Sequence, residues 1–186
     1  MMNFEIEKAI KHLQKANVIL CPTDTIWGLS CDATNERAVE KIYKIKARDK
    51  NKSLIILVSN IEMLTTYLES APISLPIKFE DFPKPVTVIY PGAKNLAKNV
   101  YAHDKSIAIR IVKDGFVNKL ISTFKKPIVS TSANFSNEAS ALEFDEIKTE
   151  LKQKVDFIVD RKFGQNKAQS STILKIENQK IISIRK

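Results

Sequence analysis

Hydroxyl and amide side chains gather in one short stretch of this 186-residue sequence, at 127–137 (PIVSTSANFSN). An apolar run opens the stretch, and hydroxyls and an asparagine follow it. Such a change is typical of a buried strand that runs into a loop. Because ligands of open α/β sheets bind at the carboxyl ends of strands, we expect a binding site here. An ST-rich turn with a helix cap explains this stretch by itself equally well.

Three basic residues follow a predicted helix and precede the most apolar stretch of the chain. They are Lys46, Arg48 and Lys52. Alternate positions of an extended segment project to one side, so these cations can share one polyanion. For each residue alone, solvated charge that complements the dipole at a helix C-terminus is the alternative.

Arg110 stands within an otherwise apolar strand, SIAIR at 106–110. Ser106 and Arg110 share one face of that strand, while the two isoleucines between them point into the core. A guanidinium in such a place needs a partner, because burying it unpaired is costly. Either a carboxylate ligand or an internal Asp or Glu can serve, and the sequence favours neither.

Motifs that build a phosphate site from backbone amides are missing. The chain has no GxxxxGK[ST], GxGxxG, GxSxG or HExxH motif, and it has only four glycines. Side chains must therefore supply most contacts to any phosphorylated ligand. PTDTIWGL at 22–29 adds small hydroxyls before an aromatic–glycine pair, and a Pro-initiated turn capped by Asp24 is the alternative there.

The composition, 44% hydrophobic and 27% charged, is that of a globular domain. A formal net charge of +9 favours anionic partners: nucleic acid, nucleotides or acidic surfaces. No apolar run approaches the ~20 residues of a membrane span, and no signal peptide is present, so we expect a cytoplasmic protein without membrane contact. Cys21 and Cys31 lack metal or redox spacing and are expected to be buried thiols.

The elements that must position these residues alternate between helices and strands. A first helix is expected with Asn3 as its cap and Phe4, Ala9, Ile10 and Leu13 on one face. Further helices are expected at 35–47, 60–68, 116–124 and 143–152, and strands at 18–21, 29–31, 53–59, 86–90, 105–111, 127–130, 157–159, 172–176 and 181–185. Some strands follow one another directly, which favours an α/β fold with a twisted, mixed parallel and antiparallel sheet flanked by helices, in one domain spanning 1–186.

Five segments in this order resemble the Sua5/YrdC/TsaC family of L-threonylcarbamoyladenylate synthases. They are PTDTIWGL at 22–29, IYKIKARDKNKSLIILV at 42–58, SIAIR at 106–110, STSAN at 130–134 and SSTI at 170–173. Each segment alone is a weak signal, but together they cover nearly the whole chain. The resemblance implies a YrdC-like fold in the short, single-domain form.

The family reaction joins L-threonine, bicarbonate or CO₂, and ATP into threonylcarbamoyl-AMP and pyrophosphate, with Mg²⁺ accompanying the ATP. A downstream threonylcarbamoyl-transferase complex then uses the product for the t6A37 modification of tRNA. The resemblance thus implies a nucleotidyltransferase, and tRNA binding would suit its charge. Catalysis would be positional, without a side-chain nucleophile and without a protein ligand for the metal.

The resemblance also implies which residues form the site. Those expected to bind ATP are Lys46, Arg48, Lys52, Ser106, Ser132, Asn134, Ser140 and Arg185. Those expected to bind threonine are Thr25, Arg110, Ser130 and Ser171. Arg110 would hold the carboxylate, because its planar fork binds such groups bidentately. We expect Lys46 and Arg48 to be partly exposed.

The chain departs from the family pattern mostly where the family has Pro or Gly, at Asp49, Ser53, Lys84, Val112 and Asn137. The polar residues expected to face ligands are retained. The departures therefore bear on loop geometry and affinity more than on chemistry.

Two other functions remain open at this level. A YrdC-like RNA-binding module without synthase activity fits the charge, but it would not need Arg110 or the Ser/Thr/Asn loop. A carbamoyltransferase-type relative would use another amine or carbamoyl phosphate.

Overall fold

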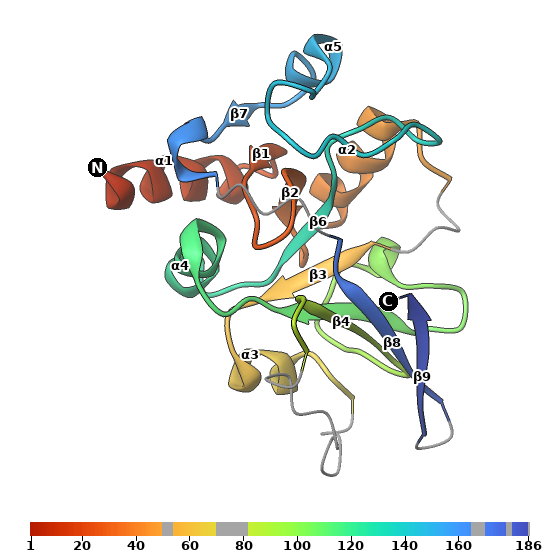
Figure 1. Ribbon diagram of the computed structural model, residues 1–186. Helices are drawn as coiled ribbons and strands as arrows, with labels where there is room; N and C mark the ends of the chain where they lie inside the picture. The colour runs from red at the N-terminus through yellow and green to blue at the C-terminus, as the bar shows by residue number, and fades with distance from the viewer. Residues whose placement is uncertain (50–53, 70–81, 165–169, 178–179, 186) are drawn as a thin grey trace.

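A nine-stranded mixed sheet runs through the part of the chain that the computed structural model describes, residues 1–49, 54–69, 82–164, 170–177 and 180–185 (Figure 1). The strand order is β7-β1-β2-β6-β3-β5-β4-β8-β9. The strands are β1 (Ile19–Cys21), β2 (Gly28–Asp32), β3 (Ile55–Val58), β4 (Val86–Tyr90), β5 (Ile107–Ile111), β6 (Ile128–Ser132), β7 (Phe157–Ile158), β8 (Thr172–Glu177) and β9 (Lys180–Arg185). The mixed α/β fold predicted from the sequence is confirmed.

Parallel and antiparallel pairs alternate irregularly across this sheet. The pairs β1–β7, β3–β5 and β4–β8 are parallel. The pairs β1–β2, β2–β6, β3–β6, β4–β5 and β8–β9 are antiparallel. Strands that follow one another directly in the chain, such as β1 and β2, make the antiparallel pairs that the sequence predicted.

Helices cover the sheet and bury its apolar side chains. They are α1 (Met2–Gln14), α2 (Glu36–Lys46), α3 (Ile61–Thr66), α4 (Gly115–Phe124) and α5 (Thr149–Lys152), with short 3₁₀ turns η2 (Lys98–Val100) and η3 (Arg161–Phe163). Helix α1 packs on α4 and on β1 and β2, α2 packs on β2, and α4 packs on β3. Between them lie the buried aliphatic side chains of the core. Figure 1 shows α1 and α4 side by side.

Asparagine caps fix where two of the helices begin. The Asn35 side chain accepts a hydrogen bond from the backbone N–H of Ala38, and Asn60 accepts one from Met63. Each cap satisfies an N–H that has no partner within its helix. Both helix starts were predicted from the sequence and are confirmed. The two cysteines, which the sequence placed in the core, are indeed buried free thiols.

The predicted face of the first helix is confirmed at Ala9, Ile10 and Leu13, which are buried or partly buried, but the prediction is wrong for Phe4 and for the cap Asn3. The helix begins after Met1, so Asn3 lies inside it, and Phe4 is 62% exposed. The buried positions are Ile6, Ala9 and Leu13, which recur every three to four residues on the side that faces α4 and the sheet. Ile6 therefore takes the place on this face that was expected for Phe4.

The helix predicted at 143–152 is also wrong in its first half, because only Thr149–Lys152 is helical. The Glu146 carboxylate accepts hydrogen bonds from the backbone N–H groups of Leu142 and Glu143, which closes a turn instead. The Phe144 ring lies 4.8 Å from that of Trp27. A local carboxylate turn and a tertiary aromatic contact thus replace the helix.

Position 53 of the strand predicted at 53–59 lies outside the described residues.

Candidate active site

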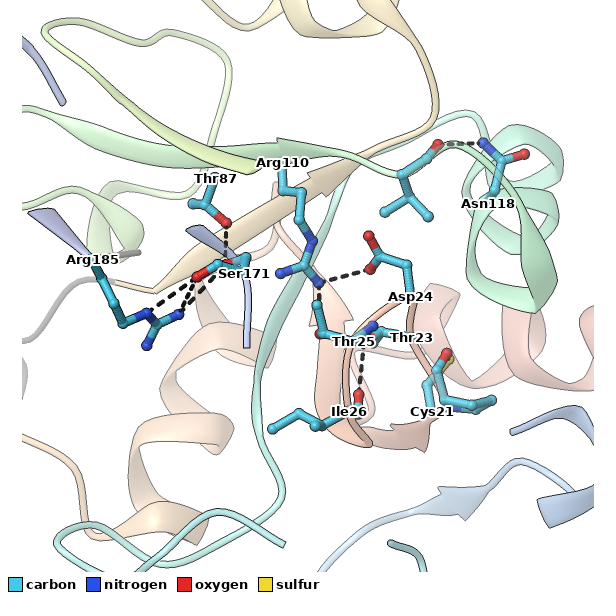
Figure 2. A network of polar contacts seen from close by, with 12 residues as sticks. Cys21, Thr23, Asp24, Thr25, Ile26, Thr87, Arg110, Asn118, Ser171 and Arg185 are labelled. Carbon is cyan, nitrogen blue, oxygen red and sulfur yellow. Dashed lines mark hydrogen bonds and ion pairs between the residues drawn. The ribbon is translucent and has the colours of Figure 1, made fainter. Parts of the chain in front are cut away.

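Strand register brings four of the chemically distinctive segments together. Ser132 of β6 pairs with Gly28 of β2, and Ser130 of β6 pairs with Ile55 of β3. On the other side of β3, Arg110 of β5 pairs with Leu57 and also with Thr87 of β4, whose strand pairs in turn with β8. Figure 2 shows the resulting polar network between the loop 22–26, β5 and the start of β8.

Arg110 is the buried centre of this network, with 4% of its surface exposed. Its Nη2 atom lies 2.9 Å from Asp24 Oδ1 and 3.3 Å from Thr25 Oγ1. Its Nε atom is buried and has no hydrogen-bond partner among the described residues. Burial lowers the pKa of Arg110, and Asp24 acts in the opposite direction. The internal carboxylate that the sequence left open is therefore Asp24, and one donor of the guanidinium is still unused.

Hydrogen bonds within the loop 22–26 hold Thr25 in place. Thr23 Oγ1 donates to the carbonyl of Ile26 over 2.7 Å and accepts from the backbone N–H of Thr25 over 3.1 Å. The two threonine hydroxyl oxygens are 2.9 Å apart. These contacts form a closed ST turn, so Thr25 reaches Arg110 from a rigid support.

A second arginine completes the charged side of the network. Arg185 donates from Nε and Nη2 to the carbonyl oxygen of Ser171, over 3.2 and 2.9 Å. The Ser171 hydroxyl lies 2.8 Å from Thr87 Oγ1. The positive charge of Arg185 contributes to the lowered pKa of Arg110. The C-terminal arginine thus lies beside the site and, with Arg110, makes it suitable for an anion.

Lys46 does not lie where the sequence placed it. It is 1% exposed rather than partly exposed, and its Nζ atom lies 2.5 Å from the carbonyl oxygens of both Ser132 and Asn134. Burial, followed by the charge of Arg48, lowers the pKa of Lys46 to about 8, while Glu138 raises it. The reason is helical spacing, because Lys46 follows Ile42 on the buried face of α2.

The other residues predicted to bind ATP surround this network at different depths. Arg48 is partly exposed, as expected, and burial lowers its pKa. Ser106 is 8% exposed and lines a pocket with Asp104 and Lys175. Ser140 is exposed, and the Asn134 amide donates to the carbonyl of Glu138 over 2.7 Å. Lys52 lies outside the described residues.

The predicted residues thus divide into two groups. In the first group, Arg110 contacts Thr25 and Asp24, and Ser171 contacts Arg185 and Thr87. The two clusters are neighbours because Thr87 pairs with Arg110 in the sheet. Ser132 and Asn134 belong to a neighbouring set, held by Lys46. Ser106 instead donates from its backbone N–H to Asp104 over 3.0 Å, and Ser140 is exposed.

Sequence reasoning missed two residues of the network, Asp24 and Thr87. Asp24 lies in the PTDTIWGL segment, where the sequence suggests only a turn cap. Thr87 lies three residues after Lys84, which the sequence marks only as a departure from the family pattern. The signal for Thr87 is its place in the strand that pairs with β5, opposite Arg110.

No group of three or more His, Cys, Asp or Glu residues in the described ranges lies close enough to hold a metal ion. Within the same ranges, no helix has the length and apolar character that a membrane crossing requires.

The described residues form an α/β protein whose mixed sheet carries a network of two arginines, one carboxylate and several hydroxyls. Residues 11–186 match the Sua5/YciO/YrdC family, which is described as telomere recombination. The chain belongs to this family.

Among curated proteins, the chain is similar to the threonylcarbamoyl-AMP synthase of Pseudoalteromonas translucida, with 36% identity over 95% of each chain. It is 34% identical to the threonylcarbamoyl-AMP synthase of Psychromonas ingrahamii, over 80% of this chain and 79% of that one. Each of these alignments spans more than three quarters of the relative.

Solved structures share the fold at lower identity. Escherichia coli YciO matches with a TM-score of 0.84 and 22% identity, over 100% of this chain and 89% of that one. Pyrococcus abyssi Sua5 in complex with L-threonine matches with a TM-score of 0.86 and 23% identity, over 97% of this chain. The match spans 53% of that Sua5 chain, so this chain corresponds to about half its length.

Proposed function

We propose that this chain is a threonylcarbamoyl-AMP synthase, which joins L-threonine, bicarbonate or CO₂, and ATP with release of pyrophosphate. Two relatives carry this name at 36% and 34% identity. The structural observation that best supports the proposal is the buried guanidinium of Arg110, whose Nε has no partner among the described residues. A small carboxylate ligand would complete its hydrogen bonds.

Threonine would bind between the loop 22–26 and β5. Arg110 would hold its carboxylate, and the hydroxyls of Thr25, Ser130 and Ser171 would supply the neutral contacts. Thr25 is hydrogen-bonded to Arg110, Ser171 is hydrogen-bonded to Thr87, and all four ligand-facing residues are buried. A site with such prepared donors loses little freedom when the ligand binds.

ATP would bind on the adjoining surface, where Arg48, Arg185 and Ser106 are expected to contact it together with Ser132, Asn134, Ser140, Lys46 and Lys52. Cationic side chains would take the place of a phosphate-binding glycine loop. Mg²⁺ would be carried mainly by phosphate oxygens and water. The lysine ammonium of Lys46 already donates to two carbonyls, so its contribution would include holding Ser132 and Asn134 in position.

The chemistry would proceed by orientation and charge neutralisation. The amine of threonine forms a N–C bond with CO₂ and releases a proton, which gives a carbamate. A carbamate oxygen then forms a bond to the α-phosphorus of ATP, the bond from that phosphorus to the bridging oxygen breaks, and pyrophosphate leaves. The two arginines would offset the charge that builds up on the phosphates.

A threonylcarbamoyl-transferase complex would consume the product in tRNA modification. The net charge of +9 would allow the tRNA itself to bind.

The test is an assay of pyrophosphate release from ATP with Mg²⁺. We expect release only when both L-threonine and bicarbonate are present. Release that does not depend on threonine, or none at all, would contradict the proposal. A carbamoyltransferase-type relative would react with serine in place of threonine, or with carbamoyl phosphate in place of bicarbonate. The same assay with these replacements distinguishes it from a threonylcarbamoyl-AMP synthase. An RNA-binding module would bind RNA and release no pyrophosphate.

A further inference from the structure

Asp24 is the acidic member of the network in Figure 2, and no role in the reaction has been given to it so far. Its Oδ1 atom lies 2.9 Å from Nη2 of Arg110, and 12% of its side chain is exposed. Figure 2 shows no contact between its second oxygen, Oδ2, and the other residues drawn. A carboxylate can accept several hydrogen bonds, so this oxygen remains available to a ligand.

The charges around Asp24 are arranged in a defined order. Across Figure 2 the order is Arg185, Ser171, Arg110 and Asp24, with Thr87 beside Ser171. The two arginines are close enough for the charge of Arg185 to act on Arg110. Arg110 is 4% exposed and still has a buried, unpartnered Nε among the described residues. The site therefore has an unused donor of positive charge beside an unused acceptor of negative charge.

A zwitterion has the complementary arrangement. Its carboxylate suits the arginine fork, and its ammonium, a few ångströms away, suits a carboxylate. We propose that Asp24 holds the α-amino group of the amino-acid substrate while Arg110 holds its carboxylate. The pair then selects α-amino acids over carboxylic acids that lack the amine. This inference rests on the proposed function, since it concerns the amino-acid substrate of that reaction.

The simpler role for Asp24 is to neutralise Arg110, and it makes the opposite prediction. If Asp24 only neutralised Arg110, it would compete with the substrate carboxylate, and its removal would strengthen the binding of every carboxylate ligand. If Asp24 holds the amine, its removal weakens only ligands that have an amine. The sign of the effect therefore separates the two roles.

The test compares L-threonine with 3-hydroxybutyrate, which is threonine with hydrogen in place of the amino group. Calorimetry would measure the binding of both to the wild type and to Asp24→Asn. We expect Asp24→Asn to bind threonine at least tenfold more weakly and 3-hydroxybutyrate equally well or more tightly. Equal or tighter binding of threonine by Asp24→Asn would overturn the proposal.

Asp32→Asn is the matched control. Asp32 is also a buried carboxylate in an ion pair, 3.0 Å from Lys126, but it lies outside this network. We expect Asp32→Asn to bind both ligands as the wild type does. If it weakened threonine alone to the same degree, the effect would come from a general loss of structure and the proposal would fail.

The wild type provides a readout that does not depend on the folding of a variant. It should bind threonine at least tenfold more tightly than 3-hydroxybutyrate, and equal affinities would overturn the role of Asp24. Failure of the proposed function gives a different result. In that case the wild type would neither bind threonine nor release pyrophosphate in its presence.

Discussion

The ammonium nitrogen of Lys46 lies 2.5 Å from the carbonyl oxygen of Ser132, so the end of α2 is tied directly to the end of β6. The backbone repeats the connection, because Ser136 N–H donates to the carbonyl of Lys46 over 2.9 Å. A residue expected to bind phosphate from the surface is thus also a buried support for the loop that carries Ser132 and Asn134.

Lys46→Met should destabilise the protein, contrary to what its expected exposure implied. The change removes the hydrogen bonds that the buried Lys46 ammonium donates to two part-buried carbonyls, and we expect a loss of about 2–3 kcal/mol in the free energy of unfolding. Chemical denaturation would measure it. Lys44→Met, at an exposed position of the same helix, is the control and should change stability little. Equal stability of the two variants would mean that the buried contacts of Lys46 contribute nothing.

The stability that Lys46 provides should increase with pH. The folded protein releases the Lys46 proton near pH 8, whereas the unfolded chain keeps it to about pH 10.5, its ordinary pKa. Between these values the unfolded state binds more protons, so the folded state gains stability as the pH rises. Relative to Lys46→Met, the wild type should gain up to about 3 kcal/mol from pH 7.5 to 10.5. A flat difference over this range would contradict the lowered pKa.

Arg48→Ala should weaken ATP binding about tenfold with little loss of stability, because Arg48 is partly exposed. Calorimetric titration with ATP would measure the affinity. Arg37→Ala removes an equal charge from an exposed position of α2 and controls for the general field of the protein. Unchanged ATP affinity in Arg48→Ala would count against a phosphate contact.

Arg110→Ala should raise the KM for threonine at least tenfold and leave the KM for ATP nearly unchanged. Arg110→Lys keeps the charge beside Asp24 but loses the planar fork. It should therefore be more stable than Arg110→Ala and show the same selective rise in the KM for threonine. Steady-state pyrophosphate release would measure both constants. An equal rise in the two KM values would assign Arg110 a structural role.

Gly28→Ala should disturb the site through close packing. A Cβ atom there would lie 2.8 Å from Ser130 Oγ and 3.1 Å from the carbonyl oxygen of Thr131. Such overpacking costs about 1–3 kcal/mol, and it would displace a hydroxyl expected to contact threonine. Thermal unfolding and threonine binding would show both effects. Addition of Ser130→Ala should recover part of the lost stability, and a purely additive double variant would show that the two positions do not clash.

Local patterns determined much of the secondary structure and the family. Apolar runs predicted the strands, and Asn35 and Asn60 predicted two helix starts. The PTDTIWGL, SIAIR and STSAN segments contain candidate site residues. These signals act over a few residues, through side-chain periodicity and capping, so they can be read without the fold. The resemblance to the Sua5/YrdC/TsaC family followed from their order.

Contacts between distant residues were decided only by the tertiary structure. Asp24 and Arg110 are far apart in the chain, and they meet because β2, β6, β3 and β5 pair in a particular order and register. The charge of Lys46 predicted partial exposure. In the structure Lys46 lies on the buried face of α2 with Ile42 and contacts the end of β6. Phe144 lies outside any helix, contrary to the prediction, and its ring packs against Trp27. Sequence periodicity identifies a buried face, whereas strand register and packing determine which polar groups meet there.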